Sequence, residues 1–239
     1  MTGVTDMADA QGGSRETFPV ELQLWLSPSF PVGSFAYSHG LEWAVGQARV
    51  HDRASAVAWI GDLLRHGSAR NDAILLAAAW RAARDGDAVR LAEVNDLALA
   101  LSGSRERYLE TSTQGKAFVT TVGAAWPGRI PKELFVALSG PVAYPVGVGA
   151  VAGAADLPLA GTAQALLAAF VSNLVSALVR LAAIGQTDGQ RVIACLAATI
   201  SSVASNASSS SLDELGGASF VSEIAALAHE TQETRMFRS

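Results

Sequence analysis

The side chains of this sequence that could carry out chemistry are few, and their spacing matches no common catalytic or metal-binding motif. The four histidines are His39, His51, His66 and His229. No two of them stand four residues apart, the spacing that puts two metal ligands on one face of a helix. The single cysteine, Cys195, stands in an apolar run and is expected to be a small buried core residue rather than a nucleophile.

Two glycine-containing segments come close to nucleotide-binding motifs without completing them. Residues 146–152 fit a loose Gly-x-Gly-x-x-Ala, but Pro145 precedes them where a dinucleotide-binding fold needs a β-strand. Gly115 and Lys116 are followed by Ala117, so the Ser or Thr of a phosphate-binding loop is missing. We therefore predict close helix packing at 146–152, no nucleotide hydrolysis of the P-loop type, and a chain that is not an enzyme.

Two segments combine polar and aromatic residues. Residues 27–42 contain two prolines, three aromatic residues and a final carboxylate, Glu42, and are expected to form a structured loop with Glu42 at a helix start. Residues 229–239 end in Arg-Met-Phe-Arg-Ser, although chain ends usually fray. Arginine and aromatic residues are enriched at interface hot spots, so this segment is either a mobile tail or a binding peptide. We expect residues 235–239 to dock at an interface.

The composition points to an acidic, apolar protein. The chain has 239 residues, a formal net charge of −5, 50% hydrophobic residues and only 16% charged residues. The negative balance excludes a basic nucleic-acid footprint for the whole chain. Because an average soluble domain has about 25% charged residues, part of the surface is expected to be covered by partners.

Three long stretches carry no charge, at residues 134–155, 157–179 and 192–212. Prolines, glycines, serines and amide side chains interrupt them, so we interpret them as buried or partner-covered helices and not as membrane spans. The N-terminal residues are polar and lack the basic start and apolar core of a signal peptide. The expected location is the cytoplasm.

Helical spacing of apolar residues dominates from residue 18 onward. Residues 1–17 are expected to be a disordered tail, and residues 18–239 a single all-α bundle of about ten helices. Asp52, Asp87 and Ser104 are expected N-caps, and Asn71 or Asp72 a further one. The longest helix is expected at 162–183, with its apolar stripe incompletely covered in a monomer.

Two stretches break this helical pattern. Residues 134–138 are the only short β-strand candidate. The serine-rich residues 201–211 are expected to form a loop after a helix over 188–200.

The loop at 27–42 resembles the signature that opens the UreF family of urease accessory proteins, Ser-Pro-x-x-Pro-Val-Gly-x-x-x-Tyr-Ser-x-Gly-Leu-Glu. Four further segments resemble family motifs in the right order, at 105–115, 144–149, 181–190 and 229–239. The resemblance covers residues 20–239. The chain departs from the pattern at Met236, where leucine is usual, and at Glu233 or Thr234, where the family often has an aromatic residue.

The resemblance implies an all-α, non-catalytic, cytosolic maturation factor. Such a protein binds a second accessory protein (UreD, also called UreH), forms homodimers and recruits the GTPase UreG, and the assembly delivers nickel to apo-urease. It implies no stably bound cofactor, with nickel handled by the assembled complex. The partner-binding residues expected from these motifs are Tyr37, Ser38, His39, Glu42, Arg105, Gln186, Gln190, His229, Glu230, Arg235, Phe237, Arg238 and Ser239.

Two alternatives belong to other functional classes. One is a small-ligand-binding helical bundle whose pocket is lined by the glycine-rich middle of the chain; its melting temperature would rise with the correct metabolite. The other is an enzyme whose site is assembled from His39, Glu42 and Arg105. Glu42 and Arg105 are rather expected to fix register between helices or partners, so that Glu42→Ala lowers urease activation, or changes which metal is admitted, with little effect on the fold.

Overall fold

The computed structural model describes residues 18–239, and the disorder expected for residues 1–17 lies outside this part of the chain. Residues 18–239 form helices and connecting loops without a β-strand, which confirms the expected all-α bundle. The helices are α1 (Val20–Trp25), α2 (Leu41–Gly46), α3 (Arg53–His66), α4 (Ser68–Arg84), α5 (Ala88–Ala100), α6 (Arg105–Ala125), α7 (Lys132–Ala137), α8 (Tyr144–Ala154), α9 (Leu159–Arg180), α10 (Gln186–Ser209) and α11 (Phe220–His229), with 3₁₀ turns η1 (Ser34–Ala36) and η2 (Leu212–Glu214).

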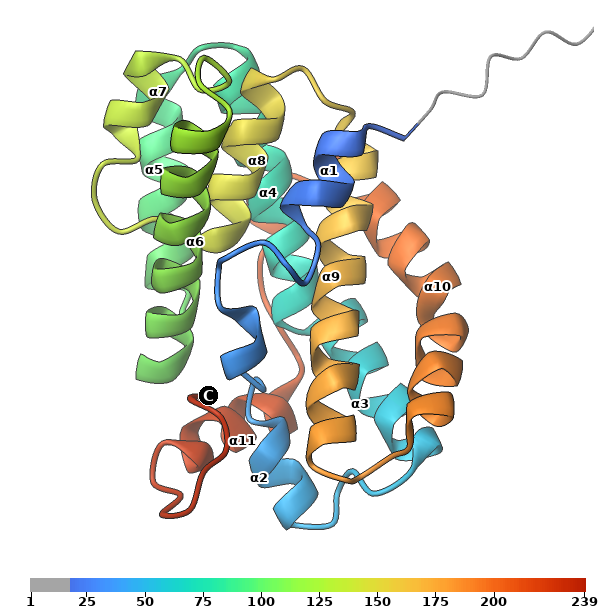
Figure 1. Cartoon of the computed structure of the whole chain (residues 1–239). Coiled ribbons are helices and arrows are strands. Elements are labelled where there is room, and N and C mark those ends of the chain that lie inside the picture. The colour runs from blue at the N-terminus through green and yellow to red at the C-terminus, as the bar shows by residue number, and fades with distance from the viewer. Residues whose placement is uncertain (1–17) are drawn as a thin grey trace, which may run out of the picture.

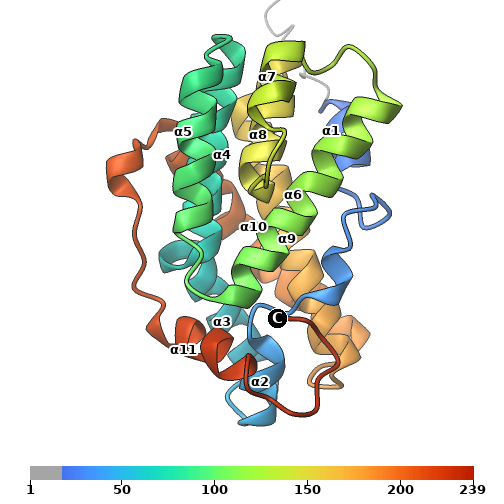
Figure 2. The ribbon, with the colours of Figure 1, turned by 90° about the vertical axis from the view of Figure 1, so that its left-hand side faces the viewer.

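The helix α4 runs through the middle of the bundle (Figure 1). It contacts α3, α5, α8, α9 and α10, while α6 packs on α8 and α7 packs on α5. Turning the molecule shows α2 and α11 together at one end, with the last residues of the chain beside them (Figure 2). Segments from both ends of the sequence therefore meet at one pole of the bundle.

The backbones of α4 and α8 approach so closely that no side chain fits between them at two glycines of α8. A Cβ atom built on Gly149 would lie 2.3 Å from the carbonyl oxygen of Leu76, and one on Gly153 would lie 2.2 Å from that of Trp80. The expected close helix packing at 146–152 is confirmed. The glycine-rich middle is thus filled by neighbouring backbone, which leaves no room there for the pocket of a small-ligand-binding bundle.

Three of the expected helix caps are confirmed. Asp52 forms a capping box with Ser55, and the side chains of Asp87 and Ser104 each accept a hydrogen bond from the backbone N–H three residues on. The expected cap at Asn71 or Asp72 is wrong, because α4 already begins at Ser68 after Gly67. Asp72 therefore lies inside α4, one turn from its start.

Two local predictions are wrong. Residues 134–138 are not a strand: α7 buries Leu134 and exposes Val136, a one-sided pattern that a five-residue run cannot distinguish from alternation. The serine-rich tract is not a loop, since α10 continues to Ser209. The hydroxyls of Ser201 and Ser208 donate hydrogen bonds to the carbonyl four residues back, for Ser208 to Ala204 at 2.8 Å, which leaves the helix intact.

The helices α9 and α10 are long and apolar enough to cross a membrane by length and composition, with mean hydropathies of 1.7 and 1.4. Half of the most apolar 18-residue stretch of α9 is buried inside the bundle, where Val171, Leu174 and Leu178 are fully enclosed. Its other edge, around Ala165 and Ala168, borders an apolar groove of about 550 Å³ beside α1. One edge of α9 is incompletely covered in the single chain, and its coverage by a second copy stays a prediction.

Candidate functional site

The C-terminal segment, residues 235–239, is docked on the bundle. Phe237 and Ser239 are buried, and the Arg180 guanidinium lies 4.4 Å from the centre of the Phe237 ring. The backbone N–H of Ser38 donates to the carbonyl of Ser239 at 2.7 Å, and that of Arg238 donates to the carbonyl of Ala36 at 2.8 Å. The segment is therefore not a mobile tail: it covers the 27–42 loop of its own chain, and its binding to a partner stays a prediction.

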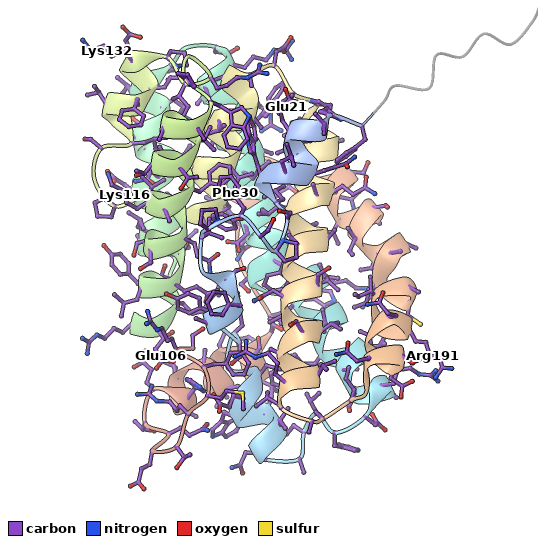
Figure 3. The ribbon with its side chains drawn as sticks, in the orientation of Figure 1. Glu21, Phe30, Glu106, Lys116, Lys132 and Arg191 are labelled. Atoms are coloured by element: carbon purple, nitrogen blue, oxygen red, sulfur yellow. The ribbon has the colours of Figure 1, made fainter. Side chains whose placement is uncertain are left out.

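A charged cluster whose two glutamates and histidine are buried and whose arginine is exposed, here called the Glu42 cluster, ties this segment to three helices. It consists of Glu42 on α2, Glu106 on α6, His229 on α11 and Arg235. His229 Nε2 lies 3.1 Å from Glu42 Oε2, and its Nδ1 lies 2.7 Å from Glu106 Oε2. Arg235 donates to Glu106 Oε1 at 2.6 Å. Glu106 lies at the lower end of α6, next to α11 and the C-terminal segment (Figure 3).

Glu42 also holds the backbone of the C-terminal segment. Its two carboxylate oxygens accept hydrogen bonds from the N–H groups of Met236 at 2.7 Å and Phe237 at 3.0 Å. His229 thus has a carboxylate at each ring nitrogen, and Arg235 donates to the second oxygen of Glu106. The cluster therefore joins α2, α6 and α11 to the C-terminal segment.

A second buried group, the Glu110 cluster, lies one turn further along α6. It consists of His39, Arg107, Glu110, Gln114 and Ser239. Glu110 Oε1 lies 2.8 Å from His39 Nε2, and Glu110 Oε2 accepts from Arg107 at 2.7 Å and from the Ser239 hydroxyl at 3.2 Å. The Arg107 guanidinium also contacts the His39 ring.

The electrostatics of the Glu110 cluster keep its carboxylate charged. Burial alone would raise the pKa of Glu110, but the charges of His39 and Arg107 and the hydrogen bonds to it lower that pKa to about 2. Burial and the Arg107 charge lower the pKa of His39, against the opposing influence of Glu110. The neutral ring then donates from Nε2 to Glu110 and accepts at Nδ1 from Arg107.

Asp72 faces the same interior without a hydrogen-bond donor among residues 18–239. Together with His39, Arg107 and Glu110 it lines a small cavity of about 60 Å³ between α4, α6 and α9. Burial raises the pKa of Asp72 to about 6; the charge of Glu110 adds to this, and that of Arg107 opposes it. A raised pKa in a carboxylate means that the folded state holds its proton more tightly than the unfolded state does.

Replacing Asp72 with asparagine is expected to stabilise the protein above pH 6. Between its usual value near 3.8 and about 6, the folded state binds more protons at Asp72, so its contribution to stability falls as the pH rises. The shift sets an upper limit of about 3 kcal/mol on the gain at pH 8. Urea unfolding at pH 4 and pH 8 measures it. The gain should be nearly lost at pH 4, close to the usual pKa of the group, and Asp213→Asn, at an exposed position, is the control.

The structure brings together most of the residues expected to bind partners. Tyr37 is buried in the loop that the C-terminal segment covers, and Glu230 accepts a hydrogen bond from the N–H of Glu106 at 3.2 Å. Gathered at this pole are Tyr37, Ser38, His39, Glu42, His229, Glu230, Arg235, Phe237, Arg238 and Ser239. Gln186 and Gln190 are exposed in the first turns of α10 and make no contact with either cluster.

Arg105 lies outside both clusters, and its role in partner binding stays a prediction. It is exposed at the first position of α6, and Arg107 contacts His39 in its place. The alternative enzyme site of His39, Glu42 and Arg105 is therefore not formed. Sequence reasoning also missed Asp72, Glu106 and Glu110. The spacing of Glu106 and Glu110 by four residues after the Ser104 cap was the available signal, since it places both on one face of α6.

The chemistry of metal binding is weakly represented in the described part of the chain. Among residues 18–239 no group of three or more His, Cys, Asp or Glu side chains has a metal-binding arrangement. Cys195, expected in the core, is exposed on the outer face of α10. The ring nitrogens of the buried histidines already make hydrogen bonds with carboxylates and arginine. We therefore interpret both clusters as groups that hold backbone segments in place.

Comparison with known protein sequences identifies the family of this chain. A sequence profile of the UreF family matches residues 50–197. The urease accessory protein UreF of Xanthobacter autotrophicus is 51% identical over 243 residues, covering all of both chains, and that of Rhodopseudomonas palustris is 50% identical over 240 residues with the same full coverage. The UreF protein of Methylobacterium radiotolerans is 49% identical over 92% of this chain and 96% of its own. The chain belongs to the UreF family of urease accessory proteins.

Proposed function

We propose that this chain is a non-catalytic scaffold of urease maturation that works in the cytoplasm. In this proposal it binds a UreD/UreH-like accessory protein, recruits and regulates a UreG-like GTPase, and helps deliver nickel to apo-urease. Family membership supports the role in urease maturation. The absence of a P-loop from the sequence supports a division of labour in which the partner supplies the nucleotide site.

The observation that carries the proposal is an exposed apolar face on α11. Phe220, Val221, Ile224 and Leu227 are between 47% and 70% exposed, and three of them recur at helical spacing. Neighbouring Met236, in the C-terminal segment, is 55% exposed. Single exposed apolar residues are ordinary, but a continuous apolar helix face marks a protein interaction site.

The opposite face of α11 explains how this surface is presented. A Cβ atom on Gly40 would lie 2.6 Å from the backbone nitrogen of Ala226, so α11 lies directly on the loop that precedes α2. His229, in the last turn of α11, reaches both carboxylates of the Glu42 cluster. The partner-facing helix is thus fixed by the same groups that hold the C-terminal segment.

The surfaces for the other partners are proposed in less detail. The uncovered edge of α9 supports a homodimer, since a second copy would bury its apolar groove. Nickel is cargo in this proposal, passed on by the assembled complex, with no stably bound cofactor in this chain. Co-purification with the UreD/UreH-like and UreG-like proteins, followed by urease activity in cells that lack this chain, tests the whole assignment.

Replacing Ile224 with aspartate is expected to weaken binding of the UreD/UreH-like protein at least tenfold, because it places a charge in the centre of the apolar face. Helix content should not change, since Ile224 is 57% exposed. Val89→Asp on α5 is the matched control, at a 73% exposed position away from α11. Equal binding by both variants in a pull-down would contradict the assignment of α11.

A further inference from the structure

A polar groove lies on the side of the bundle away from the two clusters, between α3, α4, α10 and η2. Its volume is about 720 Å³, within the range of sites for small organic ligands. Its lining consists of two arginines, Arg65 and Arg70, the carboxylate of Glu214, a set of hydroxyl and amide side chains in and just after α10, and an apolar floor that includes Ile74 and Val203. We call it the Arg65 groove.

Arg65 contributes a positive charge that no carboxylate neutralises among residues 18–239. Its guanidinium donates to the Thr199 hydroxyl at 3.0 Å, across from α3 to α10. A Cβ atom on Gly61, one turn earlier in α3, would lie 2.8 Å from Arg65 Nη1. The absence of a side chain at Gly61 therefore lets the guanidinium lie along α3 and against the groove wall.

Arg70 contributes a second, only partly neutralised charge. It donates to the backbone carbonyl of Glu214 at 2.8 Å, while its other nitrogen lies 3.9 Å from the Glu214 carboxylate. That carboxylate is already engaged, since it accepts from the N–H of Ser211 at 2.9 Å and from the Ser210 hydroxyl at 3.0 Å. The groove thus carries two guanidinium groups against one committed carboxylate, in a chain whose net charge is −5.

We propose that the Arg65 groove binds a small organic anion that carries carboxylate or phosphate groups. Guanidinium groups recognise the oxygens of both through paired N–H donors, and such bonds are stronger than neutral ones. Thr199, Ser202 and Asn206 on α10 supply further donors for a polar ligand. The floor formed by Ile74, Val203 and Ala207 suits a molecule with a carbon skeleton. This site is separate from the surfaces used in the proposed function.

Titration calorimetry of the full chain with citrate and with inorganic phosphate tests the proposal. Saturable, salt-sensitive binding of either probe is expected, and the stronger of the two identifies carboxylate or phosphate as the preferred group. Arg65→Ala should weaken that binding at least tenfold. Gly61→Ala should weaken it as well while keeping the charge, because the new methyl group displaces the guanidinium.

The controls separate binding from folding. Gly61→Ala favours the helix, so a loss of binding with unchanged helix content cannot come from unfolding. Arg191→Ala removes an exposed arginine of α10 that pairs with Asp188 and should leave binding unchanged. The proposal is overturned if neither probe saturates at millimolar concentration, or if Arg65→Ala and Arg191→Ala bind the probes equally.

Discussion

Replacing Glu42 with alanine is expected to lower the free energy of unfolding by about 3–5 kcal/mol, the range found when one partner of a buried ion pair is removed. Glu42 is only 8% exposed and accepts hydrogen bonds from His229 and from two backbone N–H groups of the C-terminal segment. Without it those donors lose their acceptor in a buried site. Because of this geometry we expect a large loss of stability for Glu42→Ala, in place of the small effect on the fold that the sequence suggested.

The loss of Glu42 should affect function through the segments that the Glu42 cluster holds together. The Glu42 cluster joins α2, α6 and α11 to residues 235–239, so its failure should release the C-terminal segment and loosen α11 while the α4–α8 core persists. Proteolysis and hydrogen exchange at α11 measure this directly. Deletion of residues 235–239 should likewise leave helix content intact and abolish partner binding.

Glu93→Ala is the matched control for Glu42. Glu93 pairs with Arg90 at 3.1 Å, but both side chains are more than half exposed, and such surface pairs contribute about 0–1 kcal/mol. Urea unfolding should therefore show a small change for Glu93→Ala and a large one for Glu42→Ala. Equal midpoints for the two variants would mean that the Glu42 cluster does not stabilise the fold.

Local signals predicted most of the helices. Asp52, Asp87 and Ser104 were sufficient to place three helix starts, because capping depends on residues only three positions apart. The extent of α10 was not predictable in the same way. Serines are weak helix formers, and the apolar residues between them stabilise the helix only through the packing of α10 against α9, α3 and α4.

The site was predictable in its residue types and only partly in its geometry. The sequence pointed to His39, Glu42 and His229, yet Glu42 and His229 are 187 positions apart, and no periodicity relates them. Arg107, which the sequence did not single out, contacts His39 and Glu110, whereas Arg105 points elsewhere because two residues along a helix turn the side chain by more than half a circle. The docking of the C-terminal segment depends on that same long-range contact with Glu42 and Glu106.

The close crossing of α4 and α8 gives the second large expected effect. Replacing Gly149 with alanine is expected to destabilise the protein by about 3 kcal/mol, at the upper end of the usual cost of overpacking. The added methyl group would lie 2.3 Å from the carbonyl oxygen of Leu76 and 3.0 Å from its carbon. Both are backbone atoms of α4, so neither can move away without moving the helix.

Gly46→Ala is the matched control, since a Cβ atom at Gly46 in α2 would meet no atom within 4 Å. Alanine is the better helix former by about 1 kcal/mol, so the control should be neutral or stabilising and any loss at Gly149 reports the contact alone.

Gly149→Ala and Gly153→Ala both push α8 away from α4. Because one displacement relieves both clashes, the double variant should lose less stability than the two single losses together. Thermal or urea unfolding of the four variants decides this, and a Gly149→Ala protein as stable as Gly46→Ala would show that α8 can withdraw from α4 at no cost.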